Sequence, residues 1–270
     1  ENPGLAREPS RSPCIGARVP RRQRKTPAVK LAIQTELDYH FNQPTDVLLQ
    51  VEAAMIPEQV VETAHIDLPP TEHFARVPGH DTIGDRLWLR LEGEFRVPYN
   101  ATVWIERLTG ALGAFPAVPP HRLPSPTVQY LMPSRYCPSD QFQNLVEAEF
   151  GSTQGGARIA AMRDWIEANI AYVPGASDPF TGALQTYVSR CGVCRDFAHV
   201  LIAMARASAI PARYASVYGL GVNPQDFHAV AEVFLDGAWH LVDPTGMADA
   251  GSMAKIAVGR SARVSRCCAA

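Results

Sequence analysis

Residues 181–213 read TGALQTYVSRCGVCRDFAHVLIAMARASAIPAR, and the rest of the chain can be interpreted around them. Gly192 interrupts the local structure, and Cys194 follows it. Apolar residues then recur at helical spacing until Ile210-Pro211 ends the pattern; they are Phe197, Val200, Leu201 and Met204. The pattern predicts a buried helix with Cys194 in its first turn.

A cysteine in the first turn of a helix has a chemical consequence. Unpaired backbone N–H groups and the helix dipole both favour negative charge at this point, so the thiol of Cys194 is expected to ionise more easily than that of a free cysteine. The thiolate is the nucleophilic form. A cysteine that begins an apolar helix is also a common small core residue. Its assignment as a nucleophile therefore depends on its partners.

Candidate partners lie in two strand-like runs downstream. The runs cover residues 227–235 and 238–243, and they flank Asp236-Gly237, a strong signal for a two-residue hairpin turn. With that turn, the position numbers of any two residues that face each other across the hairpin add up to the same total. His228 and Asp243 are then diagonal neighbours on one face, about 7 Å apart at their Cβ atoms. Their side chains are expected to reach each other.

The other histidines are weaker candidates for a base. His240 is expected on the opposite face of the hairpin. His199 lies five positions after Cys194, a rotation of about 140° around a helix, so it projects from a different face. The remaining histidines lie in the first half of the chain, without a cysteine motif, and are interpreted as ordinary surface or polar-face residues: His40, His65, His73, His80 and His121.

A cysteine at a helix start with a histidine and an aspartate on an adjacent hairpin meets the requirement for thiol-based acyl transfer. The imidazole takes the thiol proton, and the carboxylate fixes the imidazole tautomer and stabilises the imidazolium. The predicted catalytic residues are therefore Cys194, His228 and Asp243.

Three segments carry family-level information. Residues 192–213 read GVCRDFAHVLIAMARASAIPAR, residues 226–245 read DFHAVAEVFLDGAWHLVDPT, and residues 255–260 read KIAVGR. They resemble three blocks of the bacterial transglutaminase-like superfamily, and the resemblance covers roughly residues 130–260. It implies an α+β, papain-like core in which the helix that bears the cysteine packs on an antiparallel sheet.

The resemblance places the family nucleophile on Cys194, its base on His228 and its orienting acid on Asp243. It implies a cysteine peptidase or amidase that acts on a peptide or protein substrate through a thioester, with no metal or organic cofactor. Other members are protein cross-linkers, and some have lost the triad and only bind peptide. Residues 261–270, SARVSRCCAA, depart from the family pattern and favour the silent alternative. The substrate, the acyl acceptor and the oligomeric state stay open.

The first half of the chain is β-like. Residues 31–41 alternate apolar and polar side chains, residues 42–45 read as a turn, and alternation returns at residues 47–51 and in three runs between residues 87 and 105. These patterns predict an N-terminal β-sandwich-like domain over residues 30–112.

The remaining segments complete a predicted domain organisation. Residues 1–29, rich in Arg, Pro, Gly and Ser, are expected to be a disordered or non-native tail. Residues 113–129 are a Pro-rich linker expected to be extended, and residues 130–270 form the transglutaminase-like catalytic domain. Within it, apolar spacing from Ile159 to Ile170 predicts a helix with its N-cap at Ser152 or Thr153 that packs beside the Cys194 helix. The polar loop over residues 174–181 is expected to border the cleft.

Composition describes an ordinary globular protein. The 270 residues are 46% apolar and 19% charged, with a net charge of −2, so neither nucleic acid nor a membrane is expected as a partner. Residues 1–30 lack the continuous apolar stretch of a signal peptide or membrane span. We therefore expect a cytoplasmic location and reduced cysteines.

One alternative comes from another class of protein. Cys191-Gly-Val-Cys194 matches a C-x-x-C motif, which occurs in redox and metal-binding proteins. A thioredoxin-like site would follow a βαβ pattern, whereas the segment before Cys191 reads as a loop. A structural zinc site would need a second spaced pair, and the adjacent Cys267-Cys268 is a poor substitute. These points favour acyl transfer.

Overall fold

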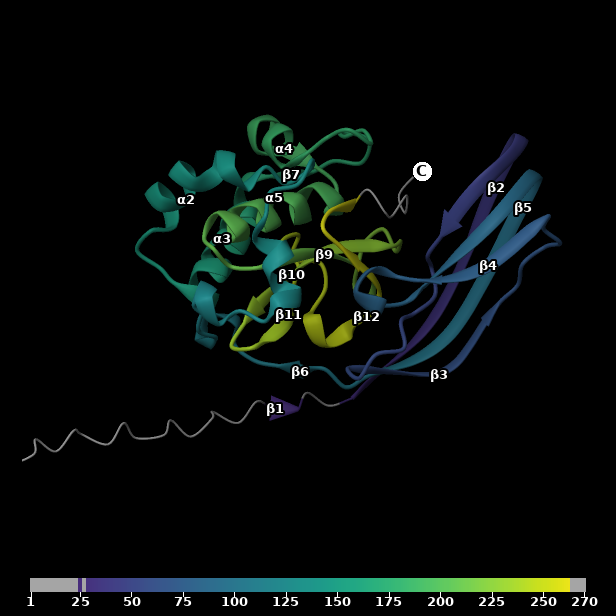
Figure 1. Ribbon diagram of the computed structural model, residues 1–270, viewed down its shortest axis with the longest axis horizontal. Coiled ribbons are helices and arrows are strands. Elements are labelled where there is room, and N and C mark those ends of the chain that lie inside the picture. The colour runs from purple at the N-terminus through teal and green to yellow at the C-terminus, as the bar shows by residue number, and fades with distance from the viewer. Residues whose placement is uncertain (1–23, 26–27, 263–270) are drawn as a thin grey trace, which may run out of the picture.

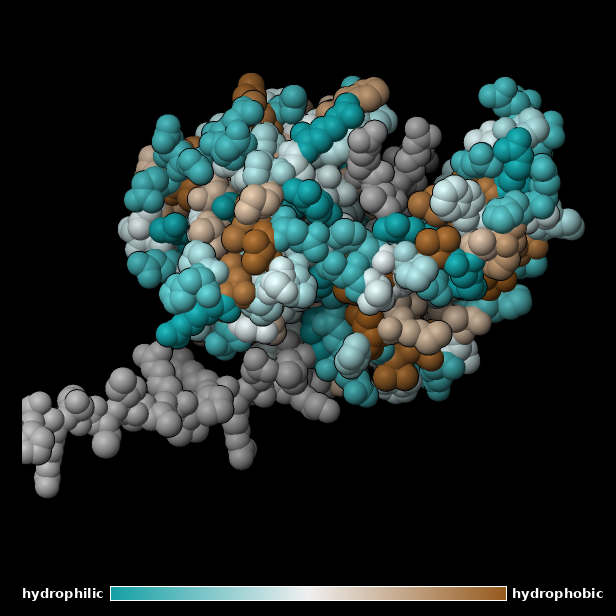
Figure 2. Space-filling model, in the orientation of Figure 1, coloured by the Kyte–Doolittle hydropathy of each residue, from teal (hydrophilic) through white to brown (hydrophobic). Residues whose placement is uncertain are grey.

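The computed structural model describes residues 24–25 and 28–262, which form two parts (Figure 1). One part is an N-terminal antiparallel sheet, and the other is a group of helices packed on a second four-stranded sheet of order β11-β10-β9-β12. The face shown in Figure 2 is largely hydrophilic, with separate apolar patches over both parts. No described helix is both long and apolar enough to span a bilayer.

The N-terminal sheet is built on two long strands. β2 (Val29–Leu49) and β5 (Asp85–Ile105) pair in antiparallel fashion along their whole length. β3 (Gln59–Ile66) and β4 (His73–Pro78) pair end to end with the other edge of β5. Within the described part of the chain β2 is consequently an edge strand, because its pairing with β5 occupies only one of its two edges.

Residues 42–45 do not form the expected turn, and the three runs between residues 87 and 105 are not separate strands. Residues 42–44 of β2 instead oppose the single residue Glu92 of β5, and pairing resumes beyond them. Such a bulge bends a strand without ending it. Composition alone does not separate a bulge from a turn, so the prediction of a break here was wrong.

The expected sandwich is also replaced by a single sheet among the described residues. One part of its apolar face is covered by the core part of the molecule, while a second buried cluster around Leu87, Leu89 and Val97 lies within the N-terminal part. Leu31, Ile33, Tyr99 and Val103 pack in one buried cluster with Tyr218, Ala254 and Ile256. The alternation was identified correctly, but among the described residues no second sheet of the same domain covers the apolar face, and the core sheet covers one part of it.

The core sheet consists of β9 (Ala212–Gly219), β10 (His228–Leu235), β11 (Ala238–Val242) and β12 (Met253–Gly259), all antiparallel. The β10–β11 hairpin has the predicted register, with Leu235 paired to Ala238. Asp236 and Gly237 have φ values of 51° and 81°. These left-handed conformations are the ones that a two-residue turn of this type requires.

The helix α5 (Cys194–Ala207) begins at the predicted residue and lies on the core sheet. The Asp196 carboxylate accepts a hydrogen bond of 2.9 Å from the backbone N–H of Val193, which caps the helix. A Cβ at Gly192 would lie 2.8 Å from the Cβ of Asp196, so only glycine fits beside this cap. The local sequence thus sets where Cys194 stands.

Three helices surround α5: α2 (Gln143–Phe150), α3 (Gly155–Asn169) and α4 (Ala183–Ser189). α3 packs on α5 as predicted, with Ile159, Met162 and Ile166 in the shared core. Its N-cap is Gln154, so the expected caps were wrong. The Thr153 hydroxyl instead donates to the carbonyl of Phe150 and closes the preceding helix.

The segment after residue 111 is not an extended connector. It contains the 3-10 turns η2 (Leu112–Ala114) and η3 (Pro120–Arg122) and the short helix α1 (Ser125–Val128). The N–H of Gly156 donates to the carbonyl of Phe115 at 2.8 Å, which ties the segment to α3. Proline fixes φ but does not prevent tight turns, which explains the difference. The domain limits stay a prediction.

The remaining short elements are η1 (His80–Thr82), η4 (Gln129–Leu131), η5 (Ser139–Phe142), η6 (Ala250–Ser252), β7 (Ala171–Tyr172) and β8 (Cys191–Gly192). β1 (Arg24–Lys25) pairs with β6 (Leu108–Thr109), so the expected tail over residues 1–29 is ordered at this point. Residues 1–23, 26–27 and 263–270 lie outside the described residues. Most of the predictions for the two ends of the chain concern these residues.

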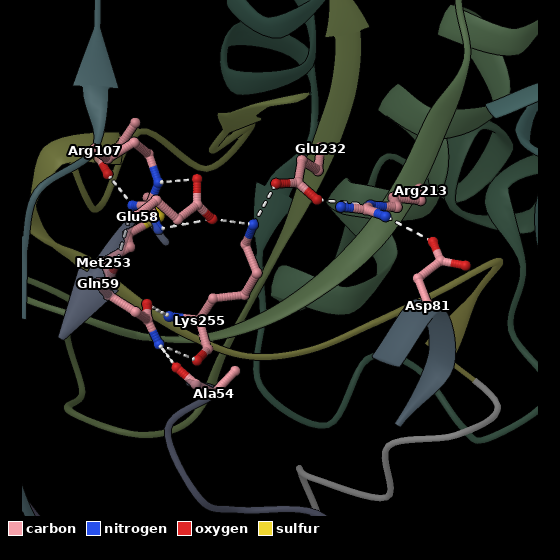
Figure 3. A network of polar contacts seen from close by, with 10 residues as sticks. Ala54, Glu58, Gln59, Asp81, Arg107, Arg213, Glu232, Met253 and Lys255 are labelled. Carbon is pink, nitrogen blue, oxygen red and sulfur yellow. Dashed lines mark hydrogen bonds and ion pairs between the residues drawn. The ribbon is translucent and has the colours of Figure 1, made fainter. Parts of the chain in front are cut away.

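A buried chain of charges joins the two parts (Figure 3). Glu232 on β10 lies at its centre and is bonded to Arg213 of β9 and Lys255 of β12. Lys255 also contacts Glu58, which precedes β3. Because Glu58 belongs to the N-terminal part, this series of ion pairs crosses the interface between the two parts.

The network continues at both ends. Arg213 contacts Asp81 of η1 at 2.7 Å, and Arg107 contacts Glu58 at 3.3 Å. Burial acts to raise the pKa of Glu232, but its ion pairs with Lys255 and Arg213 outweigh this and lower the pKa to about 2. Glu232 is therefore ionised in the interior at neutral pH, and it is the carboxylate that its two cations share.

We expect Glu232→Gln to lower the free energy of unfolding by about 3–5 kcal/mol at pH 7, because it removes the carboxylate that the two buried cations share and, among the described residues, leaves Arg213 with Asp81 alone and Lys255 with Glu58 alone. Since the folded-state pKa of Glu232 lies below its ordinary value of 4.5, its contribution is present above pH 4.5 and is lost as the pH falls toward 2. Urea denaturation of the two proteins across this range measures the effect. Glu62→Gln, which removes an exposed partner of Lys30, is the control and should change stability far less. Equal effects of both changes would contradict the role of the network.

Candidate active site

The three candidate residues stand at the ends of three different elements. Cys194 begins α5, His228 begins β10, and Asp243 directly follows β11. All three are buried, with exposed fractions of 1%, 2% and 7%. Side chains at element ends can converge without interrupting the ladder of the sheet, and that is the arrangement here.

His228 and Asp243 are in direct contact. Nε2 of His228 lies 2.9 Å from Oδ2 of Asp243, the distance of a charge-assisted hydrogen bond. β11 ends at Val242, so Asp243 lies just outside the strand and not within it as expected. The hairpin register nevertheless brings the two side chains together on one face, as the sequence predicted.

Asp243 is held by three further hydrogen bonds. Oδ1 accepts from the backbone N–H of Thr245 at 2.9 Å and from its hydroxyl at 2.8 Å, and Oδ2 accepts from the N–H of Ala248 at 3.0 Å. Burial acts to raise the pKa of Asp243, but the hydrogen bond to His228 and the bonds from Thr245 outweigh it and lower the pKa. The carboxylate is therefore ionised and fixed in orientation.

Sequence reasoning did not identify Thr245 or Ala248 as partners of the acid. A usable signal was present, because an aspartate followed by Pro-Thr often bonds its side chain to the backbone two residues on. The same carboxylate contacts His228 and accepts the backbone N–H of Thr245 in the turn that follows β11.

The environment of His228 favours its protonated form. Burial alone would lower the pKa, but the hydrogen bond to Asp243 and the interaction with the Cys194 thiol raise it to about 9. The ring nitrogen that faces away from Asp243, Nδ1, is buried without a hydrogen-bond partner of ordinary geometry. The hydrogen bond between a catalytic base and its nucleophile is often long before substrate binds. The arrangement can hold a thiolate beside an imidazolium.

The competing histidines lie in other environments. His199 is fully buried, and burial together with Arg195 and Arg206 lowers its pKa to about 3, so it is neutral. Its Nε2 accepts a hydrogen bond of 3.1 Å from the N–H of Ala262. His240 stacks on Phe115 with ring centres 4.2 Å apart. Neither ring contacts Asp243.

One of the sequence arguments against the C-x-x-C alternative was wrong. The segment before Cys191 is the helix α4 and not a loop as expected, and it joins the parallel strands β7 and β8, of two residues each. Within residues 28–262, Cys137, Cys191 and Cys194 form no disulfide, and no three His, Cys, Asp or Glu side chains are grouped as metal ligands would be. Burial raises the pKa of Cys137 to about 11.

The residue next to Cys194 anchors the polar loop. Nη2 of Arg195 donates to the carbonyl of Asp178 at 2.8 Å and to the hydroxyl of Ser177 at 3.0 Å, while its guanidinium also pairs with Asp196. The loop over residues 174–181 is thereby held beside the start of α5. Its position agrees with the expectation that it borders the site.

Comparison with known proteins places this chain in a family. A family model described as the transglutaminase-like superfamily matches residues 145–244. The crystal structure of a Cytophaga hutchinsonii protein is 32% identical, has a TM-score of 0.82, and aligns with 90% of this chain and 86% of that one. The chain belongs to the transglutaminase-like superfamily. The resemblance and the α+β fold predicted from the sequence are confirmed.

Two further proteins match over a smaller share of the chain or with a lower TM-score. The C. hutchinsonii protein is described as a candidate cysteine protease. An uncharacterized protein of Mycobacterium leprae is 33% identical over 98 residues, which is 33% of this chain and 34% of that protein, so the match spans about a third of its length. The periplasmic domain of TgpA from Pseudomonas aeruginosa is 18% identical with a TM-score of 0.41, over 84% of this chain and 75% of that one.

We expect Cys194 to react with iodoacetamide faster than Cys137 at pH 7, because the protonated His228 stabilises the neighbouring thiolate. His228→Ala should slow the reaction of Cys194 by about tenfold or more, since an unassisted thiol is only a few per cent ionised at this pH. Peptide-resolved mass spectrometry separates the cysteines. His240→Ala is the control and should leave the rate unchanged. An unaltered rate in His228→Ala would exclude the pairing.

Proposed function

We propose that the protein transfers acyl groups from peptide amide bonds, as a cysteine peptidase or amidase that uses Cys194, His228 and Asp243. The observation that supports this most is the geometry of His228. One of its ring nitrogens is bonded to a fixed carboxylate at 2.9 Å, and the thiol of Cys194 contributes to its raised pKa. This is the relation of nucleophile, base and orienting acid that thiol catalysis requires.

In the proposed first step, the Cys194 thiolate attacks the amide carbonyl carbon, and the carbonyl oxygen gains a negative charge. Backbone N–H groups at the start of α5 would stabilise that oxyanion. The C–N bond then breaks, and the His228 imidazolium gives its proton to the leaving amine. The products of this step are a free amine and a thioester on Cys194.

In the second step, neutral His228 takes a proton from water, and the resulting hydroxide attacks the thioester. The C–S bond breaks, a carboxylic acid leaves, and the pair returns to its starting state. Asp243 keeps the same hydrogen bond to His228 throughout, and its pKa below the ordinary value keeps it ionised as a partner for the imidazolium. The proposed reaction needs no metal or organic cofactor.

One comparison bears on the acceptor, and the burial of Cys194 bears on turnover. The C. hutchinsonii relative, described as a candidate cysteine protease, supports water as the acceptor. The second candidate function is peptide binding without turnover. It is favoured by the 1% exposure of Cys194, because a nucleophile must contact the carbonyl carbon that it attacks. Cross-linking, in which an amine replaces water, uses the same first step.

The proposed partner is a peptide or protein, and the proposed location is a reducing compartment such as the cytoplasm. The free thiols of Cys137, Cys191 and Cys194 support the second point, since disulfides are rare where thiols are kept reduced.

We expect the protein to release amine from members of a panel of peptide amides, and Cys194→Ser to lower kcat/KM by about a thousandfold or more, as for loss of a catalytic nucleophile. Amine release and acid formation, followed by mass spectrometry with and without an added alkyl amine, measure the reaction. Cys191→Ser is the matched control, because Cys191 is also a free thiol three positions away. It should retain activity.

The outcomes separate the candidates. Acid as the product supports hydrolysis, whereas a substituted amide formed only with added amine shows cross-linking. No turnover with any peptide, together with undiminished peptide binding by Cys194→Ser, would replace the proposal with a silent binding module. Equal activity of wild type and Cys194→Ser would exclude Cys194 as the nucleophile.

A further inference from the structure

A groove with a volume of about 610 Å³ lies between the two parts of the molecule. One wall is formed by residues 31–39 of β2. The other wall comes from the end of β9 and the loop that leads to β10, and it consists of Tyr218, Gly219, Leu220, Gln225, Asp226 and Phe227. The groove therefore separates the edge strand of the N-terminal sheet from the segment that carries His228.

The first wall is the edge of a strand and not one of its faces. Side chains of a strand alternate between two faces, so a wall made of nine consecutive residues presents the backbone. Among the described residues, β2 pairs with β5 alone, and its second edge borders the groove. Strand edges of this kind accept an extended chain through backbone hydrogen bonds.

The second wall reaches the candidate active site. Phe227 lines the groove and immediately precedes His228. A Cβ added to Gly219 would lie 3.9 Å from Cδ2 of His228, so the backbone of Gly219 runs beside the imidazole. The second wall of the groove therefore adjoins His228.

We propose that an extended segment of the peptide substrate binds in this groove as an additional strand on the edge of β2, with its reactive amide directed toward Cys194. This proposal rests on the proposed function and names its substrate class as extended peptide. At about 3.3 Å per residue, the nine residues of the wall match a contact of about six to nine peptide residues. The Thr35 hydroxyl is buried in this wall and has no hydrogen-bond partner among the described residues. It is a further group that can form a hydrogen bond with the peptide backbone.

The charge of the groove indicates which peptides fit. Its lining contains three carboxylates, those of Glu36, Asp38 and Asp226, and no basic side chain. Glu36 and Asp38 have Arg96 as an ion-pair partner on the outer face of the sheet. Asp226 has no ion pair with any described residue, and its carboxylate accepts the N–H of Phe227 at 2.6 Å. A peptide with a lysine or arginine near its reactive amide would complement Asp226.

Binding can be tested apart from catalysis with the Cys194→Ser protein. The probes are a lysine-containing seven-residue peptide and copies of it methylated at one backbone nitrogen each, with Kd measured by calorimetry. An added strand predicts that methylation weakens binding about three- to tenfold at every second position, because only alternate N–H groups face β2. Uniform effects, or none, would overturn the added strand.

The same complex gives a structural measurement. We expect peptide binding to slow hydrogen exchange of alternate backbone amides over residues 31–38, because they gain partners on the open edge of β2. Slowed exchange elsewhere, with residues 31–38 unchanged, would place the peptide in another site.

The charge is tested with Asp226→Asn. We expect the lysine peptide to bind this variant about threefold more weakly, as for loss of an exposed ion pair, while a peptide with norleucine at the same position binds both proteins equally. Asp164→Asn, which removes an exposed carboxylate of α3 outside the groove, is the matched control. Equal effects of both variants would overturn the assignment of Asp226.

The failure of this proposal is distinguishable from failure of the proposed function. If the protein cleaves peptides but shows neither alternate methylation effects nor protection of β2, the groove proposal is wrong and the chemistry stands. If the methylation pattern and the protection appear without turnover, the groove binds peptide and the proposed catalysis is wrong.

Discussion

The two-residue turn at Asp236-Gly237 requires left-handed backbone angles, and those angles fix the register of β10 against β11. Because side chains alternate along a strand, a shift of one residue would turn every side chain of β11 to the other face. His228 and Asp243 stand at the open end of this hairpin, where the register decides whether they meet. The 2.9 Å contact between them is therefore a consequence of a turn at the opposite end of the same hairpin.

The hairpin is in turn held by burial on both faces. All eight residues of β10 are buried. α5 packs on one side, and the N-terminal part covers β9 and β12 on the other. Glu232, in the middle of β10, is compensated by a cation of the adjacent strand β9 and a cation of β12, and the β12 cation also contacts Glu58. The strand that begins with His228 is thus fixed in the sheet and to the N-terminal part. The same contacts hold the edge of β2 beside the loop that precedes His228, so the candidate site and the proposed groove share one support.

Sequence alone predicted the parts of this arrangement that depend on local signals. The start of α5 and the hairpin register follow from helix spacing and turn chemistry over fewer than about 20 residues. The register placed His228 beside Asp243, whereas the position of Cys194 next to them was implied by the family resemblance. Other features depend on long-range contacts. Glu58 and Lys255 are 197 positions apart, and nothing in either segment indicates the other. The composition of residues 42–44 is the same for a bulge as for a turn. The alternation of apolar residues in the N-terminal sheet is the same whether it packs on the core sheet or on a second sheet of a sandwich. The groove between residues 31–39 and His228 likewise required the packing of the two parts.

The Asp243 carboxylate and the Cys194 sulfur together keep His228 protonated at neutral pH. Nitrogen NMR of the His228 imidazole as a function of pH measures this directly, in the wild type and in Asp243→Asn. The account predicts a pKa near 9 in the wild type. It also predicts a decrease of about one to two pKa units in the variant, as expected for the loss of a charge-assisted hydrogen bond. A His228 that titrates near its ordinary value of 6.5 in both proteins would contradict the account.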